Sequence, residues 1–183
     1  MVQFSVKELT GNEWLDKVVS LHERVKSELS DSQRNHLLPK TTEYFNNLLS
    51  SVTGTLLGAF ADDELIGSIS LVSALSFDDA CKKNYITALD PTGNLLKLYG
   101  EGTVSVVQSL CVLNSYAGNN ISTMLLEQAI IVAKSKKVDQ VFAQVASDNK
   151  SGFSKFAAER FEIIDTWESG HCRFLLHLHL NGL

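Results

Sequence analysis

The stretch from Thr103 to Phe161 places the strongest constraint on how this chain of 183 residues can fold. An apolar run at Val104–Leu113 predicts a buried strand, and the polar turn Asn114–Gly118 follows it. A helix is expected over Asn119–Ala133, and a second apolar strand over Gln140–Val145. A strand that returns through a helix to another strand is typical of a parallel pair. The helix start beside the strand end would expose backbone N–H groups, which can bind an anion.

The rest of the chain predicts shorter helices and strands. Apolar spacing indicates helices from a Thr10–Glu13 capping box to about Leu29, over Thr41–Leu49 and from Asn149 to Arg160. Further strands are expected at Phe4–Lys7, Thr55–Phe60, Leu65–Val72, Phe161–Trp167 and Cys172–Leu180, and the second and third of these would form an antiparallel hairpin. Residues 73–102 show no clear pattern, so we expect a helical turn or a flap there. The fold class is therefore α/β, with a mixed sheet of about seven strands, mostly antiparallel with a central parallel step, and four or so helices.

Composition narrows the class of protein. The length suggests one domain or two small ones, and a net charge of −5 gives no basic field for nucleic acid or an anionic membrane. No apolar stretch approaches the ~18 residues needed to span a bilayer, and the N-terminus lacks a signal-peptide pattern. The three cysteines Cys81, Cys111 and Cys172 are widely spaced without a CxxC motif, which favours reduced thiols and a cytoplasmic protein.

At Val112–Leu126 the sequence resembles the GNAT superfamily of acyl-CoA-dependent N-acetyltransferases. Tyr116 matches the aromatic residue of the family motif, Gly118 a frequent glycine, and Leu125-Leu126 the leucine pair of the following helix. A second set of matches is Asn149, Gly152, Phe156 and Phe161. The order of elements also fits, so the resemblance covers nearly the whole chain and implies a single GNAT-like acetyltransferase domain over residues 1–183.

The resemblance implies acetyl-CoA as the acyl donor and no metal. Its pyrophosphate would lie on the turn and helix start, and the implied cofactor-binding residues there are Ala117, Gly118, Asn119, Asn120, Ile121, Ser122 and Thr123. The pantetheine arm would pair with the backbone edge of Leu110, Cys111 and Val112, and Asn149 and Phe156 complete the implied set. Cys111 itself is interpreted as a small buried hydrophobe, because no basic residue adjoins it in sequence.

Five positions depart from the family pattern. Ala117 stands where the family has glutamine or arginine, Asn120 and Ser122 replace later motif glycines, Phe156 replaces a frequent general-acid tyrosine, and Arg160 replaces a glycine. Backbone donors do not depend on side chains, and asparagine tolerates unusual turn conformations, so the cradle can survive these changes. In the other interpretation of the turn, Asn119 or Asn120 is an ordinary helix N-cap.

The acceptor side is less defined by the sequence. In this fold His36, Tyr85, Tyr99 and Glu101 would border the acceptor cleft, and they are the candidate substrate-binding residues; no residue is assigned as general base or acid. Gln108 is expected to orient a water or to be a satisfied core amide. His177 and His179 lack a clear third metal ligand, so a solvated sheet face is the preferred interpretation of this pair.

The predicted function is direct transfer of an acetyl group from acetyl-CoA to a primary amine in a ternary complex. The acceptor would be a small molecule or a peptide. The alternative is a catalytically inactive GNAT-fold binding or regulatory module, and an α/β domain for another nucleotide ranks last because the chain lacks a Walker lysine. A homodimer through the edge of the C-terminal strand is also predicted.

Overall fold

Strands and helices alternate along the chain much as the sequence predicts. The computed structural model describes residues 2–34, 36–87, 93–168 and 172–180. Within them the strands are β1 Phe4–Leu9, β2 Gly54–Ala61, β3 Glu64–Ala74, β4 Val104–Val112, β5 Gln140–Ala146, β6 Glu162–Glu168 and β7 Cys172–His179. The α-helices are α1 Leu15–Glu28, α2 Thr42–Leu49, α3 Phe77–Lys82, α4 Asn94–Tyr99, α5 Ile121–Ser135 and α6 Lys150–Ala158. Short 3-10 helices are η1 Asn12–Trp14, η2 Asp31–Gln33 and η3 Asn114–Tyr116.

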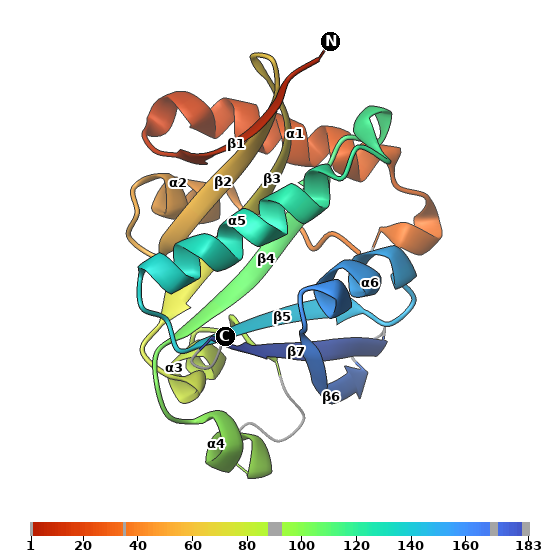
Figure 1. Ribbon diagram of the computed structural model, residues 1–183. Coiled ribbons are helices and arrows are strands. Elements are labelled where there is room, and N and C mark those ends of the chain that lie inside the picture. Colours follow the sequence, from red (N-terminus) through yellow and green to blue (C-terminus); the bar gives the residue numbers. More distant parts are fainter. Residues whose placement is uncertain (1, 35, 88–92, 169–171, 181–183) are drawn as a thin grey trace. The chain divides into compact units, whose positions relative to one another are not determined.

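The strands form one mixed sheet in the order β1-β2-β3-β4-β5-β7-β6 (Figure 1). The pairs β1/β2, β5/β7 and β6/β7 are antiparallel, whereas β4 and β5 are parallel. The predicted mixed sheet with a central parallel step is therefore confirmed. The C-terminal strand β7 is paired on both sides, by β5 and β6. The predicted dimer contact through a free edge of β7 is thus wrong, because its backbone hydrogen-bonding groups are used within the sheet.

Most predicted helices occur, and two features of the pattern differ. Thr41 caps α2, with its Oγ1 accepting from the backbone N–H of Tyr44 at 3.1 Å. The predicted capping box at Thr10 is wrong: Gly11 is the N-cap of η1 there, without a side-chain hydrogen bond. The unreadable segment 73–102 holds the two six-residue helices α3 and α4, in addition to the longer helices that were expected. No helix within the described ranges is long and apolar enough to cross a membrane.

The chain divides into two compact units. The first comprises Met1–Leu71 and Ser109–Ala129, and the second comprises Val72–Gln108 and Ile130–Leu183. The expectation of a single domain over residues 1–183 stays a prediction.

In the first unit, helices cover both faces of β3. An added Cβ at Gly67 would lie 2.9 Å from the carbonyl oxygen of Cys111 and 3.3 Å from Cδ1 of Leu125 in α5. The next residue, Ser68, points to the opposite face because side chains alternate along a strand. There its Oγ lies 2.9 Å from Nε2 of His22 in α1. The sheet of this unit is therefore enclosed between α1 on one face and the start of α5 on the other.

Replacing Gly67 by valine is expected to destabilise the protein by about 1–3 kcal/mol, because the new side chain overpacks the contact between β3, β4 and α5. The nearest obstacle is the Cys111 carbonyl, a backbone atom that moves only with β4. Urea denaturation measures the loss. An unchanged unfolding midpoint would show that α5 has room to move away from the sheet.

An aromatic cluster forms the core of the second unit. The Phe142 ring of β5 lies 5.2 Å from that of Phe77, 6.1 Å from that of Tyr99 and 5.0 Å from that of His177, between ring centroids. Nε2 of His177 lies 3.0 Å from Oε1 of Gln140, and burial lowers the His177 pKa to about 4, with the neighbouring charge of His179 as the second cause. The predicted solvated face is therefore wrong for His177, because the rings of Tyr99 in α4 and Phe142 in β5 pack against it.

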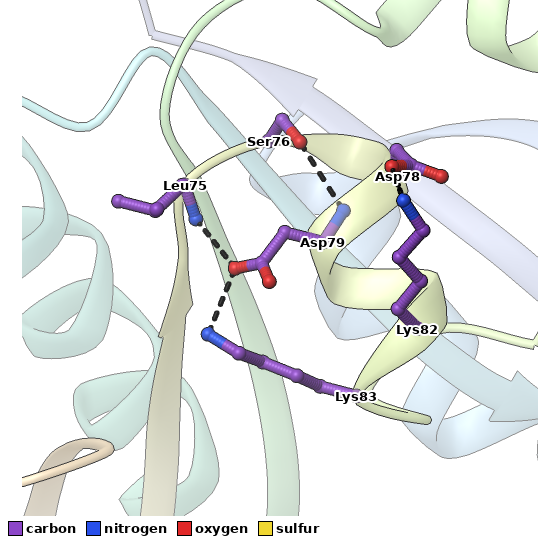
Figure 2. A network of polar contacts seen from close by, with 6 residues as sticks. All are labelled: Leu75, Ser76, Asp78, Asp79, Lys82 and Lys83. Carbon is purple, nitrogen blue, oxygen red and sulfur yellow. Dashed lines mark hydrogen bonds and ion pairs between the residues drawn. The ribbon is translucent and has the colours of Figure 1, made fainter.

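The start of α3 is fixed by its own capping network (Figure 2). The Ser76 Oγ accepts from the backbone N–H of Asp79 at 3.2 Å, and Asp79 in return accepts from the Leu75 N–H at 2.9 Å. Lys83 donates to the same carboxylate at 2.8 Å. These donors lower the pKa of Asp79, the Lys83 hydrogen bond being the first cause. Such reciprocal capping lets a six-residue helix form where the apolar pattern alone gives none.

Candidate functional site

The turn that follows β4 has an unusual backbone. After η3, Gly118 has φ +82° and Asn120 has φ +59°, so two residues of the left-handed region stand one residue apart. Nothing lies within 4 Å of where a Cβ of Gly118 would be, so the space above this residue is open. Asparagine is one of the few residues that adopts this region readily, which explains how Asn120 can replace a motif glycine.

Several backbone donors of this turn have no acceptor. Among the described residues, the N–H groups of Gly118, Asn120, Ile121, Ser122 and Thr123 make no backbone or side-chain hydrogen bond. The first bond into α5 is from the N–H of Met124 to the carbonyl of Asn120, at 3.0 Å. The Asn119 side chain donates back to the Tyr116 carbonyl at 3.1 Å and so does not cap the helix. Free donors, an exposed turn and the positive end of the helix dipole together suit an anionic ligand.

Side chains from α1 and from the start of β3 hold this turn in place. Oε2 of Glu28, the last residue of α1, accepts from the backbone N–H of Asn114 at 2.8 Å. The Tyr116 hydroxyl donates to Glu64 at 3.0 Å, and Arg24 pairs with the same carboxylate at 3.5 Å. The hydrogen bond to Glu64 is the first cause of a raised Tyr116 pKa. The position of the turn is thus set by contacts remote in sequence.

The end of β4 is also irregular. The parallel register with β5 joins Val104–Val107 to Gln140–Ala143. Two residues further, Ser109 has φ +53°, which is typical of a β-bulge, and its buried Oγ has no hydrogen-bond partner within the described chain. The predicted pantetheine edge Leu110–Val112 follows this bulge directly. A bulge re-aims the residues after it, so these backbone groups need not follow the line of the first half of β4.

A buried polar cluster joins Cys111 to α1. Nε2 of His22 lies 2.9 Å from the Ser68 Oγ and 3.5 Å from the Cys111 Sγ, and the ring packs at a tilt against Phe45 with centroids 4.7 Å apart. Burial, and next the charge of Lys40, lower the pKa of His22 to about 4, and burial raises the pKa of the Cys111 thiol to about 11. A neutral imidazole beside a protonated thiol is a packed polar group, which fits the prediction that Cys111 is not a nucleophile. Sequence analysis missed His22 because its partners lie 46 and 89 residues away.

A cavity of about 460 Å³ adjoins His22 in the first unit. It lies between α1 and the segment 37–42, with Phe45 of α2 completing the wall. His22 therefore faces the cavity on one side and contacts β3 and β4 on the other. The predicted acceptor residue His36 directly precedes the lining segment, and its N–H donates to the Gln33 carbonyl at 2.8 Å.

The other predicted acceptor residues belong to the second unit. Gln140 donates through Nε2 to the Tyr99 carbonyl at 3.1 Å and to the Glu101 carbonyl, and the Tyr99 ring packs at a tilt against His177. Gln108 donates to the Tyr85 carbonyl at 3.2 Å, so it is hydrogen-bonded as a satisfied core amide. The structure thus brings Tyr99 and Glu101 together, and the role of these residues toward a substrate stays a prediction.

Two predicted cofactor residues also belong to the second unit. The Asn149 side chain caps α6 by accepting from the Gly152 N–H at 2.9 Å. Phe156 is buried, with its ring edge-on to Phe161 at 5.1 Å. Their part in cofactor binding stays a prediction. Within the described ranges no group of three or more His, Cys, Asp or Glu residues is placed to hold a metal ion.

Comparisons with known proteins place the chain in a family. The family model of the GNAT acetyltransferases matches residues 22–152, whereas no curated protein matches the chain. Similar solved structures include NAA60 of Arabidopsis thaliana in complex with acetyl-CoA, at 15% identity and a TM-score of 0.74, covering 98% of this chain and all of that one. PaiA N-acetyltransferase of Thermoplasma acidophilum in complex with coenzyme A has 20% identity and a TM-score of 0.66, over 97% of this chain and 99% of that one. A GNAT-family acetyltransferase of Streptococcus pneumoniae has 16% identity and a TM-score of 0.69, over 98% and 100%. With its fold and most of its length matched, the chain belongs to the GNAT family of acetyltransferases.

Proposed function

We propose that this protein binds acetyl-CoA at the turn between β4 and α5 and transfers the acetyl group to a primary amine. The observation that carries the proposal is the set of free backbone N–H groups of Gly118 and Asn120–Thr123 on an exposed turn. These donors would hold the pyrophosphate, with the hydroxyl of Ser122 or Thr123 as a further donor. Relatives with this fold were solved with acetyl-CoA or coenzyme A, which supports the same cofactor here.

The remaining parts of the proposed site follow β4. The backbone of Leu110, Cys111 and Val112 would pair with the pantetheine arm as an added strand. Burial and the raised pKa of Cys111 support direct transfer in a ternary complex over an acyl-enzyme on this thiol. The acetyl-CoA would supply the activated acyl group, while the chain orients it. We propose that residues 1–183 act as one acetyltransferase domain on a small-molecule or peptide amine.

A cytoplasmic location is proposed from the chemistry of the cysteines. Cys81, Cys111 and Cys172 are free thiols, which is typical of a reducing compartment and supports a cytoplasmic protein.

An inactive GNAT-fold binding module is the second candidate. Ala117 removes one phosphate contact, and Phe156 cannot donate a proton as a tyrosine would. A lost charge-assisted contact weakens binding by about 1–3 kcal/mol and does not abolish it.

Calorimetric titration with acetyl-CoA and desulfo-CoA tests the proposal, together with release of free CoA followed by a thiol reagent in the presence of a panel of amines. We expect binding by both ligands and amine-dependent CoA release. No binding at high micromolar ligand would contradict the proposed cofactor, and binding without turnover on a broad amine panel would favour the inactive module.

A further inference from the structure

Ser109 in β4 has a backbone conformation that is unusual for its position. Its φ of +53° lies in the left-handed region, which serine rarely adopts. The other non-glycine residues with a positive φ in the described chain lie in turns or bends, so Ser109 is the one that takes this conformation inside a strand. Strain of this kind persists only where the surrounding structure imposes it, and it is concentrated at functional sites. The backbone of Ser109 therefore indicates a role beyond that of an ordinary strand residue.

The hydroxyl of the same residue lacks a hydrogen bond. Oγ of Ser109 is buried, and it has no partner within the described ranges. The residue as a whole is only half-buried, so its other atoms reach the surface while the hydroxyl is turned inward. A buried donor without an acceptor is unfavourable and needs an explanation. Because this hydroxyl has no hydrogen bond to give up, a rotation about χ1 that turns it toward a ligand loses none.

The position of Ser109 along β4 matches the reacting end of the proposed cofactor. The register of β4 with β5 ends at Val107, and the proposed pantetheine edge Leu110–Val112 separates Ser109 from the turn before α5. The pantetheine arm is about as long as four residues of extended chain. An arm that starts from a pyrophosphate at the turn and runs back along this edge therefore brings its thioester beside Ser109.

Ser105, four residues earlier in the same strand, differs from Ser109 in both respects that matter. Its Oγ is also buried without a partner in the part of the chain that the structure describes. However, Ser105 is 0% exposed and lies where β4 pairs regularly with Val141 of β5. Its hydroxyl is thus enclosed in the core, away from the proposed edge. An unpartnered hydroxyl, a positive φ and a place next to that edge occur together only at Ser109 among the described residues.

We propose that the Ser109 hydroxyl donates a hydrogen bond to the carbonyl oxygen of the acetyl group and stabilises the negative charge that this oxygen gains during transfer. The inference rests on the proposed acetyltransferase function. The amine nitrogen forms a bond to the carbonyl carbon, and the carbon–sulfur bond then breaks, with its electron pair leaving on the sulfur. The amine gives up one proton and the CoA thiolate gains one, so Ser109 keeps its own. A donor placed at the oxyanion lowers the barrier, because it binds the transition state more tightly than the ground state.

Two substitutions of Ser109 separate the hydroxyl from the backbone. Ser109→Ala removes the hydroxyl and keeps the Cβ, whereas Ser109→Gly also relieves the positive φ. We expect both variants to lower kcat for amine-dependent CoA release by about 10- to 100-fold, with only a small change in KM for acetyl-CoA. Their thermal unfolding midpoints without ligand should equal or exceed that of the wild type, because the hydroxyl has no partner to lose among the described residues. Ser105→Ala removes the other unpartnered hydroxyl of β4 and should leave kcat unchanged.

Calorimetric titration provides a second readout that needs no turnover. Acetyl-CoA carries the carbonyl and desulfo-CoA lacks the whole thioester, so the ratio of their affinities reports on the acyl end of the ligand. Ser109→Ala should reduce the preference for acetyl-CoA by about 2- to 10-fold, the effect of one neutral hydrogen bond, and leave the affinity for desulfo-CoA unchanged.

The outcomes distinguish this inference from the proposed function. A wild-type protein that binds neither ligand would refute the proposed function, and the inference with it. If acetyl-CoA binds to the wild type, the inference alone is overturned by a wild-type affinity ratio in Ser109→Ala. A wild-type kcat in either Ser109 variant, or an equal loss of kcat in Ser105→Ala, would overturn it as well.

Discussion

Replacing Ser122 by glutamate is expected to weaken acetyl-CoA binding at least about 100-fold, which corresponds to roughly 2.7 kcal/mol. Ser122 lies in the first turn of α5, among the backbone N–H groups that have no acceptor. A carboxylate there would both occupy these donors and repel the pyrophosphate. Calorimetric titration with acetyl-CoA measures the change.

Unfolding cannot account for the expected loss. A negative charge in the first turn of a helix is favourable by about 0.3–1 kcal/mol, so the thermal unfolding midpoint of Ser122→Glu should stay the same or rise slightly. Ser135→Glu is the matched control, because it makes the same substitution at the exposed far end of the same helix. Affinity that is unchanged in Ser122→Glu would mean that the turn does not bind the cofactor.

The strand–turn–helix unit could be predicted because its pattern depends on local chemistry. Its strands are apolar on both faces, and its turn combines Gly118 with Asn120, two residues suited to the left-handed region. The free N–H groups follow from any helix that begins without a capping side chain. For these reasons the fold and the proposed phosphate cradle were accessible from sequence alone.

Features that depend on tertiary contacts could not be predicted from the sequence. The spacing of a capping box is present at Thr10, but the backbone there follows a tertiary contact. Gly11 takes φ +89°, and its N–H donates to the Leu49 carbonyl at 3.1 Å, so a hydrogen bond to the end of α2 determines the conformation of this turn. The alternation in β7 suggested one solvated face, yet the ring of Tyr99, from the unpatterned segment 73–102, packs against His177.

The cavity with His22 and Lys40 joins segments that no spacing rule connects. His22 could be recognised only as a polar residue on the buried stripe of α1, beside Val18, Leu21 and Val25. Its contacts with Ser68 and Cys111 depend on the pairing of β3 with β4.

Acid is expected to destabilise the protein well above the pH at which carboxylates are protonated, because His22 is buried without charge. Its pKa is about 4 in the folded protein and about 6.5 in the unfolded chain. Between these values the unfolded chain binds a proton that the folded protein does not, so stability falls as the pH falls from 6.5 to 4. Asp79 acts in the same direction at lower pH, because its lowered pKa gives stability that is lost only near and below its ordinary value of 3.8.

The size of the acid effect follows from how far the pKa of His22 is lowered in the folded protein. For His22 the loss between pH 7.5 and pH 4.5 is about 2–3 kcal/mol, since each pKa unit corresponds to about 1.4 kcal/mol. His177 adds a smaller loss in the same direction, because it is more exposed. Urea denaturation at both pH values measures the combined loss of stability from His22 and His177.

His22→Gln separates this linkage from packing. Glutamine can still hydrogen-bond to Ser68 but has no titrating group, so the variant should lose stability at pH 7.5 through poorer packing and yet show a difference between pH 7.5 and 4.5 that is smaller by about 2 kcal/mol. If His22→Gln kept the wild-type difference, the pKa of His22 in the folded protein would have to lie near its unfolded value, and the burial of an uncharged imidazole below pH 6.5 would be wrong.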